Sequence, residues 1–315
     1  MPPFPPRNAA VVPISFEFFP PKTDEQREQL DKALPKLKPR GPEYVSVTFG
    51  AGGSTLSYTP ETIRHLRETH ALEAAPHVSC MGGSREEIRT LLAHYRSLGC
   101  RRLVALRGDM PSGMATLGEI RHASDLVAFI RRESGDHFHI EVACYPEVHP
   151  QADDARADLR HFRDKVEAGA NGAITQYFYN ADAYFRFVDD ARRAGVEVPI
   201  VPGIMPIANF TQLRRFSEMC GAEIPRWLSK RLAAFGDDAD EERADDGVAG
   251  FARALVKLDV FGAEDRREGG MEIQRGVDLV VTHAREEAAQ PLEAVEGRVV
   301  EHALRAHRRR AGVAD

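Results

Sequence analysis

The sequence has few cysteines, and no two of them are spaced to bind a metal or form a redox pair. Four cysteines occur in 315 residues, which excludes a disulfide scaffold, and no CxxC motif points to zinc. No apolar run approaches the length of a membrane span, and MPPFPPRNAA at the start lacks the charged-then-apolar pattern of a signal peptide. We therefore expect a cytoplasmic protein that does not interact with a membrane.

Several sequence motifs of nucleotide and nucleophile sites are also missing. There is no GxGxxG for a Rossmann dinucleotide site, no GxxxxGK[ST] phosphate loop and no GxSxG nucleophile elbow. Lys and Arg number 42 against 48 Asp and Glu, a net charge of −6, so no basic excess favours a nucleic-acid partner. The remaining classes are globular proteins that act on small molecules.

Short β-branched and aromatic runs alternate along the chain with stretches of helical period. The strand-like runs lie at 11–20, 43–50, 73–80, 101–109, 139–149, 172–180 and 199–206. The helix-like stretches lie at 24–38, 59–70, 84–99, 122–135, 154–169, 181–195 and 209–221. Ser84 stands three residues before Glu87, a capping-box pattern, and glycines 99, 135, 169 and 195 stand where helices are expected to end.

Seven strand–helix units with room for an eighth predict the α/β class and a closed (β/α)8 TIM barrel. The eighth strand is not recognisable. An acidic stretch (237–246) and an expected helix (247–258) are followed by 259–275, which has no clear apolar run. We divide the chain into a flexible N-terminus (1–10), a catalytic barrel (11–282) and a C-terminal helical tail (283–315).

Reacting groups of such a barrel lie at the C-terminal ends of its strands, which makes Glu17 the most informative residue. It is bracketed by phenylalanines in SFEFFPP. Apolar surroundings disfavour the charged carboxylate, so the group would keep its proton to higher pH, as a general acid requires. The alternatives are a structural glutamate paired with Lys or Arg and an exposed edge position.

Arg107, Gly108 and Asp109 follow another strand, and the glycine would let a ligand approach the backbone. A local ion pair at the strand end explains the same pattern equally well.

His77 and His149 also follow strands, and together with Glu17, Asp109 and Glu147 they could in principle hold a metal. No strand carries HxH and no helix carries HExxH, so we predict no metal.

Asp158, His161 and Lys165 fall on one face of the helix expected at 154–169. Spacing alone favours a solvated face over a phosphate or ribose contact.

Eight segments occur in an order typical of one family. They are SFEFFPPKT (15–23), VSVTFGAGGS (45–54), APHVSC (75–80), VALRGD (104–109), ASDLV (123–127), YPEVHP (145–150), KVEAGANGAITQYFY (165–179) and PGIMPIANFTQ (202–212). Together they resemble the bacterial type of methylenetetrahydrofolate reductase over about residues 12–235.

The resemblance implies a barrel that binds FAD without a Rossmann domain. NADH or NADPH reduces the FAD, and 5,10-methylenetetrahydrofolate then accepts the hydride in a ping-pong reaction that gives 5-methyltetrahydrofolate for methionine synthesis. Relatives form homo-oligomers, so we expect one here.

The family's catalytic roles fall on three residues. Glu17 matches the general acid that protonates the folate at N10, Asp109 matches the aspartate near flavin and pterin, and Gln176 matches the glutamine that holds the substrate. Other substrate contacts would come from Gln212, Phe216 and the C-terminal Arg275, which ends MEIQR, the nearest candidate for the family's last strand.

The FAD contacts implied by the resemblance are spread over the ends of four strands and over two helices. Phe49 and His122 stand where some relatives have tyrosine, and His161 also differs from some members. The full set is Thr48, Phe49, Ala51, His77, Arg107, Gly108, Asp109, His122, Ala123, Tyr145, His149, Ala152, Asp158, His161 and Lys165.

Two other functions remain open from the residues. The unrecognised eighth strand leaves room for a non-catalytic barrel that only binds flavin or folate. A barrel with other chemistry, such as a proline dehydrogenase-like flavoenzyme or a metal-dependent lyase, is disfavoured by SFEFFPP and by the missing metal spacing.

Overall fold

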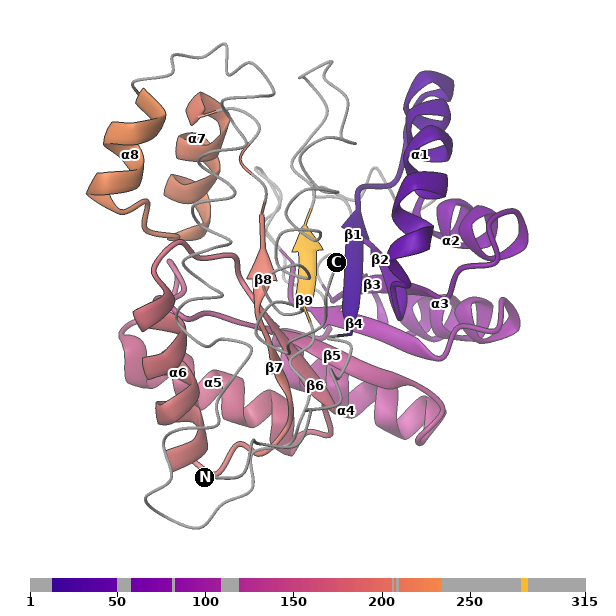
Figure 1. The fold of residues 1–315 in the computed structure, drawn as a ribbon. Helices are drawn as coiled ribbons and strands as arrows, with labels where there is room; N and C mark the ends of the chain where they lie inside the picture. Colours follow the sequence, from indigo (N-terminus) through magenta and orange to yellow (C-terminus); the bar gives the residue numbers. More distant parts are fainter. Residues whose placement is uncertain are drawn as a thin grey trace, which may run out of the picture.

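The computed structural model shows parallel strands with helices arranged around their outside (Figure 1). It describes residues 13–49, 58–80, 83–108, 119–205, 207, 210–233 and 279–282. The strands are β1 (Ile14–Phe18), β2 (Tyr44–Val47), β3 (Ala74–Ser79), β4 (Arg102–Leu106), β5 (His139–Cys144), β6 (Gly172–Thr175), β7 (Ile200–Val201), β8 (Gly203–Ile204) and β9 (Leu279–Thr282). Their order in the sheet is β7-β6-β5-β4-β3-β2-β1-β9-β8.

The sheet closes on itself through β9. This strand pairs in parallel with β1, where Ile14 lies opposite Leu279, and with β8, where Gly203 lies opposite Val280. β7 and β8 are two halves of one strand that is interrupted at Pro202, which has no N–H to donate to a ladder. The described strands therefore form the eight-stranded parallel barrel that the sequence predicts.

The eighth strand lies further along the chain than MEIQR, the nearest candidate in the sequence. The segment 259–275 lies outside the described residues, and the strand that completes the barrel is Leu279–Thr282, with the sequence LVVT. Four residues are too short a run to separate from a turn or a helix end by pattern alone. The helix expected at 247–258 and the two terminal segments also lie outside the described residues.

The helices follow the strands as predicted. They are α1 (Asp24–Leu37), α2 (Tyr58–Glu68), α3 (Arg85–Ser97), α4 (Ala123–Ser134), α5 (Ala155–Glu167), α6 (Ala181–Arg193), α7 (Phe210–Cys220) and α8 (Arg226–Ala233), with a short 3₁₀ turn at Lys38–Arg40. The capping box before α3 is present, since the Glu87 amide donates to Ser84 Oγ and the Ser84 amide donates to Glu87 Oε2. α8 was not predicted. No described helix is long and apolar enough to cross a membrane.

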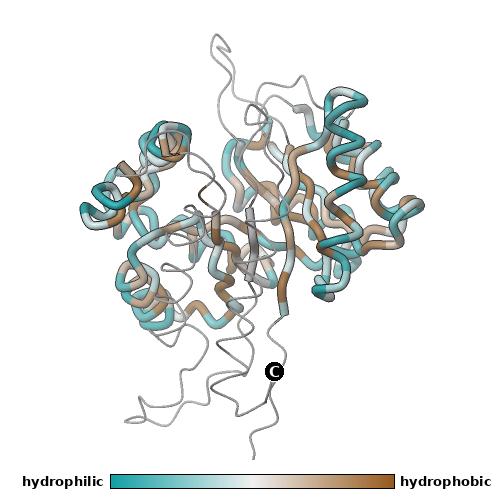
Figure 2. Tube along the Cα trace, turned by 45° about the horizontal axis from the view of Figure 1, so that its top comes forward, coloured by the Kyte–Doolittle hydropathy of each residue, from teal (hydrophilic) through white to brown (hydrophobic). Residues whose placement is uncertain are grey.

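Successive side chains of a strand point to opposite faces of the sheet, and this alternation separates two apolar layers. Phe16 and Phe18 of β1 belong to the large cluster between strands and helices. Val104, Ile174 and Val201 form a second, small cluster, and the pairing register places Val104 and Ile174 on the strand face that also carries Glu141. Figure 2 shows hydrophobic segments along the central strands and hydrophilic stretches on the outlying helices.

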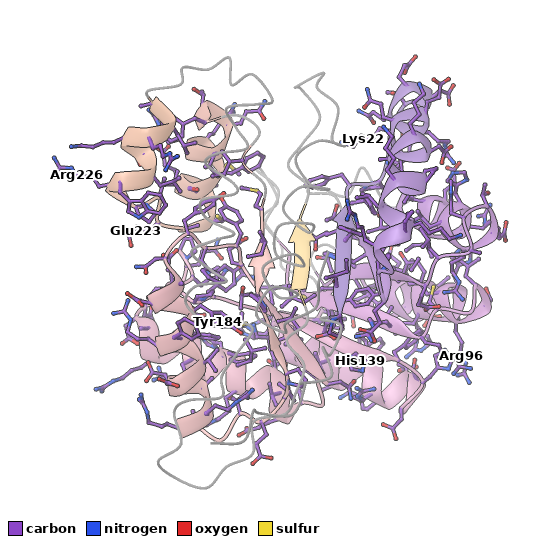
Figure 3. The ribbon with its side chains drawn as sticks, in the orientation of Figure 1. Lys22, Arg96, His139, Tyr184, Glu223 and Arg226 are labelled. Carbon is purple, nitrogen blue, oxygen red and sulfur yellow. The ribbon has the colours of Figure 1, made fainter. Side chains whose placement is uncertain are left out.

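A charged group occupies the N-terminal end of the barrel. Glu141 of β5 is buried, and its Oε1 lies 2.9 Å from Arg102 Nη1 and 2.9 Å from His139 Nε2. His139 begins β5 at the lower end of the sheet (Figure 3). Gly172 of β6 lies opposite, and a Cβ there would come within 2.4 Å of Glu141 Oε2. The glycine therefore gives the carboxylate the room to lie inside the barrel.

Candidate active site

Glu17 lies near the C-terminal end of β1, where the barrel places its functional groups. Its Oε2 is 3.5 Å from the hydroxyl of Ser46, which donates to it, and 3.2 Å from Nε2 of His77. The glutamate side chain is 17% exposed and that of His77 is 6% exposed. Three neighbouring strands, β1, β2 and β3, thus bring one acid, one hydroxyl and one imidazole together.

The surroundings of Glu17 differ from the expectation drawn from SFEFFPP. Residues next to each other on a strand point to opposite faces, and Phe16 and Phe18 pack into the outer core at 1% and 3% exposure. The aromatic rings therefore face away from the carboxyl group, which meets polar partners instead. Among the described residues Glu17 pairs with no lysine or arginine, so the structural ion pair considered as an alternative is not seen there.

Two buried polar atoms at these strand ends have no hydrogen-bond partner among the described residues. They are Nε2 of His77, which lies near Glu17 without the geometry of a hydrogen bond, and Oγ1 of Thr48. The backbone of Thr48 is held on both sides, by Phe18 O and by the hydroxyl of Thr59. Buried polar groups are normally paired, so both atoms remain available to a polar partner. Both residues belong to the predicted cofactor set.

The end of β4 turns at Arg107 and Gly108. The carbonyl of Arg107 accepts hydrogen bonds from Ser79 Oγ (2.9 Å) and Cys80 Sγ (3.3 Å), while its guanidinium donates to Gln151. Gly108 has a φ of 84°, a left-handed conformation that favours glycine. Arg107 therefore links the ends of β3, β4 and the segment after β5. Asp109, which follows Gly108, lies outside the described residues, as do Ala51 and Arg275.

The segment after β5 gathers several of the predicted cofactor contacts. The rings of Tyr145 and His149 meet edge to face at 4.5 Å. The amide of His149 donates to Asp158 Oδ2 at 2.9 Å, and the amide of Ala152 donates to the carbonyl of His149 at 2.9 Å. Tyr145, His149, Ala152 and Asp158 thus form one connected group.

The predicted face of α5 is only partly solvated. Lys165 reaches inward and donates to the carbonyl of Ala143 at 2.5 Å, and burial lowers the pKa of its ammonium group. His161 is exposed and stacks on His122, at the start of α4, with ring centroids 6.5 Å apart. Asp158 and Lys165 therefore face the strand ends, and His161 joins the N-terminus of α4, where Ala123 begins the helix.

Gln176 follows β6, where its amide donates to Cys144 O at 2.8 Å and its Oε1 accepts from the amide of Tyr177 at 3.0 Å. Tyr177 then joins β6 to α7, since its hydroxyl lies 3.1 Å from Ser217 Oγ and accepts from Cys220 Sγ at 3.3 Å. Gln212 and Phe216 are four residues apart on α7 and both half-buried, so they share one face of this helix.

Ser46 was not among the candidates from the sequence, whereas Glu147 was collected there as a residue that follows a strand. Ser46 contacts Glu17 from the adjacent strand, and its signal was the alternation of Ser46 and Thr48 in VSVTF. Glu147 fixes the loop after β5, because its Oε2 accepts from the amide of Glu223 at 2.7 Å. Glu223 lies in the turn between α7 and α8 (Figure 3). Burial raises the pKa of Glu147. No spacing rule links residues 76 positions apart.

Comparison with known proteins identifies the family. A family model described as methylenetetrahydrofolate reductase matches residues 6–260. The chain belongs to the methylenetetrahydrofolate reductase family. Curated 5,10-methylenetetrahydrofolate reductases of Salmonella typhimurium and Escherichia coli are each 42% identical over 247 residues, which is 78% of this chain and 81% of each relative. The family that the sequence segments resemble is therefore confirmed.

A plant relative and a solved structure extend the comparison. "Methylenetetrahydrofolate reductase (NADH) 1" of Arabidopsis thaliana is 38% identical, and the match covers 73% of this chain and 41% of the plant protein. An uncharacterized protein from Clostridium thermocellum, described as binding two copies of 5-methyl-5,6,7,8-tetrahydrofolic acid, aligns over 94% of this chain and 95% of its own with a TM-score of 0.58. At 15% identity, that likeness shows the fold alone.

Proposed function

We propose that the chain reduces 5,10-methylenetetrahydrofolate to 5-methyltetrahydrofolate, with FAD as cofactor and NADH or NADPH as electron donor. The observation that carries the proposal is the position of Glu17 at the end of β1, against Ser46 and His77, in a chain of the methylenetetrahydrofolate reductase family. The product would supply methyl groups for methionine synthesis. Assembly into a homo-oligomer is part of the same proposal.

The residues present fit a flavin. Thr48 Oγ1 and His77 Nε2 are buried and without a partner among the described residues, and both are available to polar atoms of a ligand. Lys165 offers a partly desolvated ammonium beside the end of β5, suited to an anionic pyrophosphate. When bound, FAD supplies the hydride chemistry that connects NAD(P)H to the folate, while the protein supplies position and charge.

Glu17 is assigned the role of general acid. Both of its side-chain contacts use Oε2, and Oε1 makes no hydrogen bond with any described residue. Oε1 is then the oxygen that donates a proton to N10 of the folate and so opens the five-membered ring. Gln176, Gln212 and Phe216 are assigned to substrate binding, and Asp109 to the region between flavin and pterin.

Replacing Glu17 with glutamine separates the two halves of the reaction. Glu17→Gln should keep FAD and oxidise NADH with an artificial quinone acceptor at the wild-type rate, because neither step needs the proton. Its reduction of the folate should fall by at least about 100-fold, the lower range for loss of a general acid. Glu28→Gln is the matched control, because Glu28 is exposed on α1, where it pairs with Lys32. Normal folate turnover by Glu17→Gln would remove the acid assignment.

A visible absorption spectrum tests the cofactor before any folate is added. The purified protein, or the protein supplied with FAD, should show an oxidised flavin that bleaches anaerobically with NADH. A protein that stays colourless with added FAD contradicts the flavin assignment. The non-catalytic alternative was motivated by the unrecognised eighth strand, and β9 removes that motive. Bleaching by NADH without any folate turnover in the wild type would restore it.

A further inference from the structure

Three metal-ligating side chains meet on the outer layer of helices. Asp31 lies on α1, His65 lies in the last turn of α2, and His70 follows α2 by two residues. Asp31 Oδ1 is 2.6 Å from His65 Nε2 and 2.8 Å from His70 Nε2. A carboxylate and two imidazoles therefore converge on one point between two helices, although up to 39 residues separate them in the chain.

The cluster is held by contacts on several sides. Arg27 of α1 pairs with Glu61 of α2 at 2.7 Å, one helical turn before Asp31 and His65. Lys38 Nζ donates to the carbonyl of His70 at 2.9 Å. The two imidazole rings meet edge to face at 5.0 Å. The backbones that carry the three side chains are thus fixed relative to one another.

We propose that Asp31, His65 and His70 form a binding site for a divalent transition metal of the zinc class, with water in the remaining coordination position. One ligand atom from each residue lies within 4.8 Å of the other two. Two imidazole nitrogens with one carboxylate oxygen are a ligand set that zinc and related metals prefer. A metal at the centre takes the place of the two Nε2 protons that now point at Asp31, and each neutral imidazole then carries its proton on Nδ1.

A hydroxyl beside His65 suits this exchange. Thr69 Oγ1 lies 3.2 Å from His65 Nδ1, so it can accept a hydrogen bond from Nδ1–H in the tautomer that leaves Nε2 free to bind the metal. Such a second hydrogen bond orients metal-binding histidines.

Exposure leaves a path for the metal and its water. The side chains of His65 and His70 are 18% and 16% exposed, whereas that of Asp31 is 37% exposed. The open side is thus the side of the carboxylate. Because α1 and α2 follow β1 and β2, a bound metal would brace the two helices after the strands that carry Glu17 and Ser46. The site is independent of the proposed reductase activity.

Zinc binding by the full-length protein tests the site directly. Protein stripped with a chelator is titrated with Zn²⁺ in a calorimeter, and its metal content is measured after gel filtration. We expect the wild type to bind one zinc ion per chain. The variants His65→Gln and His70→Gln should bind zinc at least about 100-fold more weakly, since even the loss of a residue that only orients a ligand lowers metal affinity by about 10- to 100-fold. The control His94→Gln, a half-buried histidine on α3, should bind as the wild type does.

Two further variants keep the test valid if a histidine variant folds poorly. Asp31→Asn keeps the shape of the side chain and should lose zinc binding with an unchanged circular dichroism spectrum. Thr69→Val should weaken zinc binding by about tenfold through His65, while Thr90→Val on α3 should not. Wild-type affinity in both His65→Gln and Asp31→Asn, or no binding by the wild type at millimolar zinc, would overturn the proposal.

Discussion

Replacing Arg102 with methionine should destabilise the barrel strongly, because it leaves a buried carboxylate without its arginine. Arg102 Nη1 lies 2.9 Å from Glu141 Oε1, and Nη2 lies 3.0 Å from Glu43 Oε1. Its guanidinium also covers the ring of Tyr44 at 4.4 Å from the centroid. Methionine retains most of the apolar stem of arginine, so the change removes chiefly the charge and its hydrogen bonds.

The expected loss is about 3 kcal/mol in the free energy of unfolding. Removing one partner of a buried ion pair costs about 3–5 kcal/mol, mostly because the other charge stays buried. The Glu141 side chain is only 5% exposed, so this range applies. The lower end is appropriate because His139 Nε2 remains 2.9 Å from Glu141 Oε1. For a chain of this length, that loss lowers the melting temperature by about 5 °C.

Chemical denaturation of Arg102→Met, with thermal melting as a second probe, measures the change. The double variant Arg102→Met/Glu141→Leu should recover most of the loss, because it removes the buried charge as well. Glu43→Gln is the control, and its effect should stay below about 1 kcal/mol because the Glu43 side chain is 48% exposed. A loss below about 1 kcal/mol for Arg102→Met, or no recovery in the double variant, would refute this account.

Two more predictions concern the binding residues. Lys165→Met should weaken FAD binding by about 10- to 100-fold, the cost of one charge-assisted contact. Burial lowers the pKa of Lys165, so its ammonium group should lose its proton, and the wild type its affinity for FAD, at a lower pH than an exposed lysine would give. Calorimetry over a range of alkaline pH should show this fall in affinity in the wild type and not in Lys165→Met. Tyr177→Phe loses the contact with Ser217, worth about 1 kcal/mol. The variant should raise the KM for the folate about fivefold and leave kcat unchanged. Steady-state kinetics measure both constants, and a fall in kcat would contradict this prediction.

The strands and helices of the first seven units could be predicted because their signals are local. β5, with the sequence HIEVAC, and the Ser84 capping box carry their pattern within a few neighbouring residues. β9 has four residues and α8 has eight, so neither carries enough periods to stand out. Closure of the barrel through β9 depends on pairing with β1 and β8, which are far away in the sequence.

The position of several candidate residues at strand ends could be predicted, but their surroundings could not. Strand ends identified Glu17, His77 and Gln176, and the barrel places these residues at its C-terminal face. The partners of Glu17 could not be derived from SFEFFPP, because the adjacent rings point to the other face of the strand. Contacts such as Tyr177 with Ser217 join residues 40 positions apart and follow only from the three-dimensional packing.

The two glutamates inside the barrel show how one fold separates stability from chemistry. Glu141, near the N-terminal end of β5, is held by an ion pair with Arg102. Glu17, near the C-terminal end of β1, meets only a hydroxyl and an imidazole among the described residues. Reacting groups of such barrels lie at the C-terminal ends of the strands. The position of Glu17 therefore agrees with its assignment as the acid, whereas Glu141 lies at the opposite end and serves the fold.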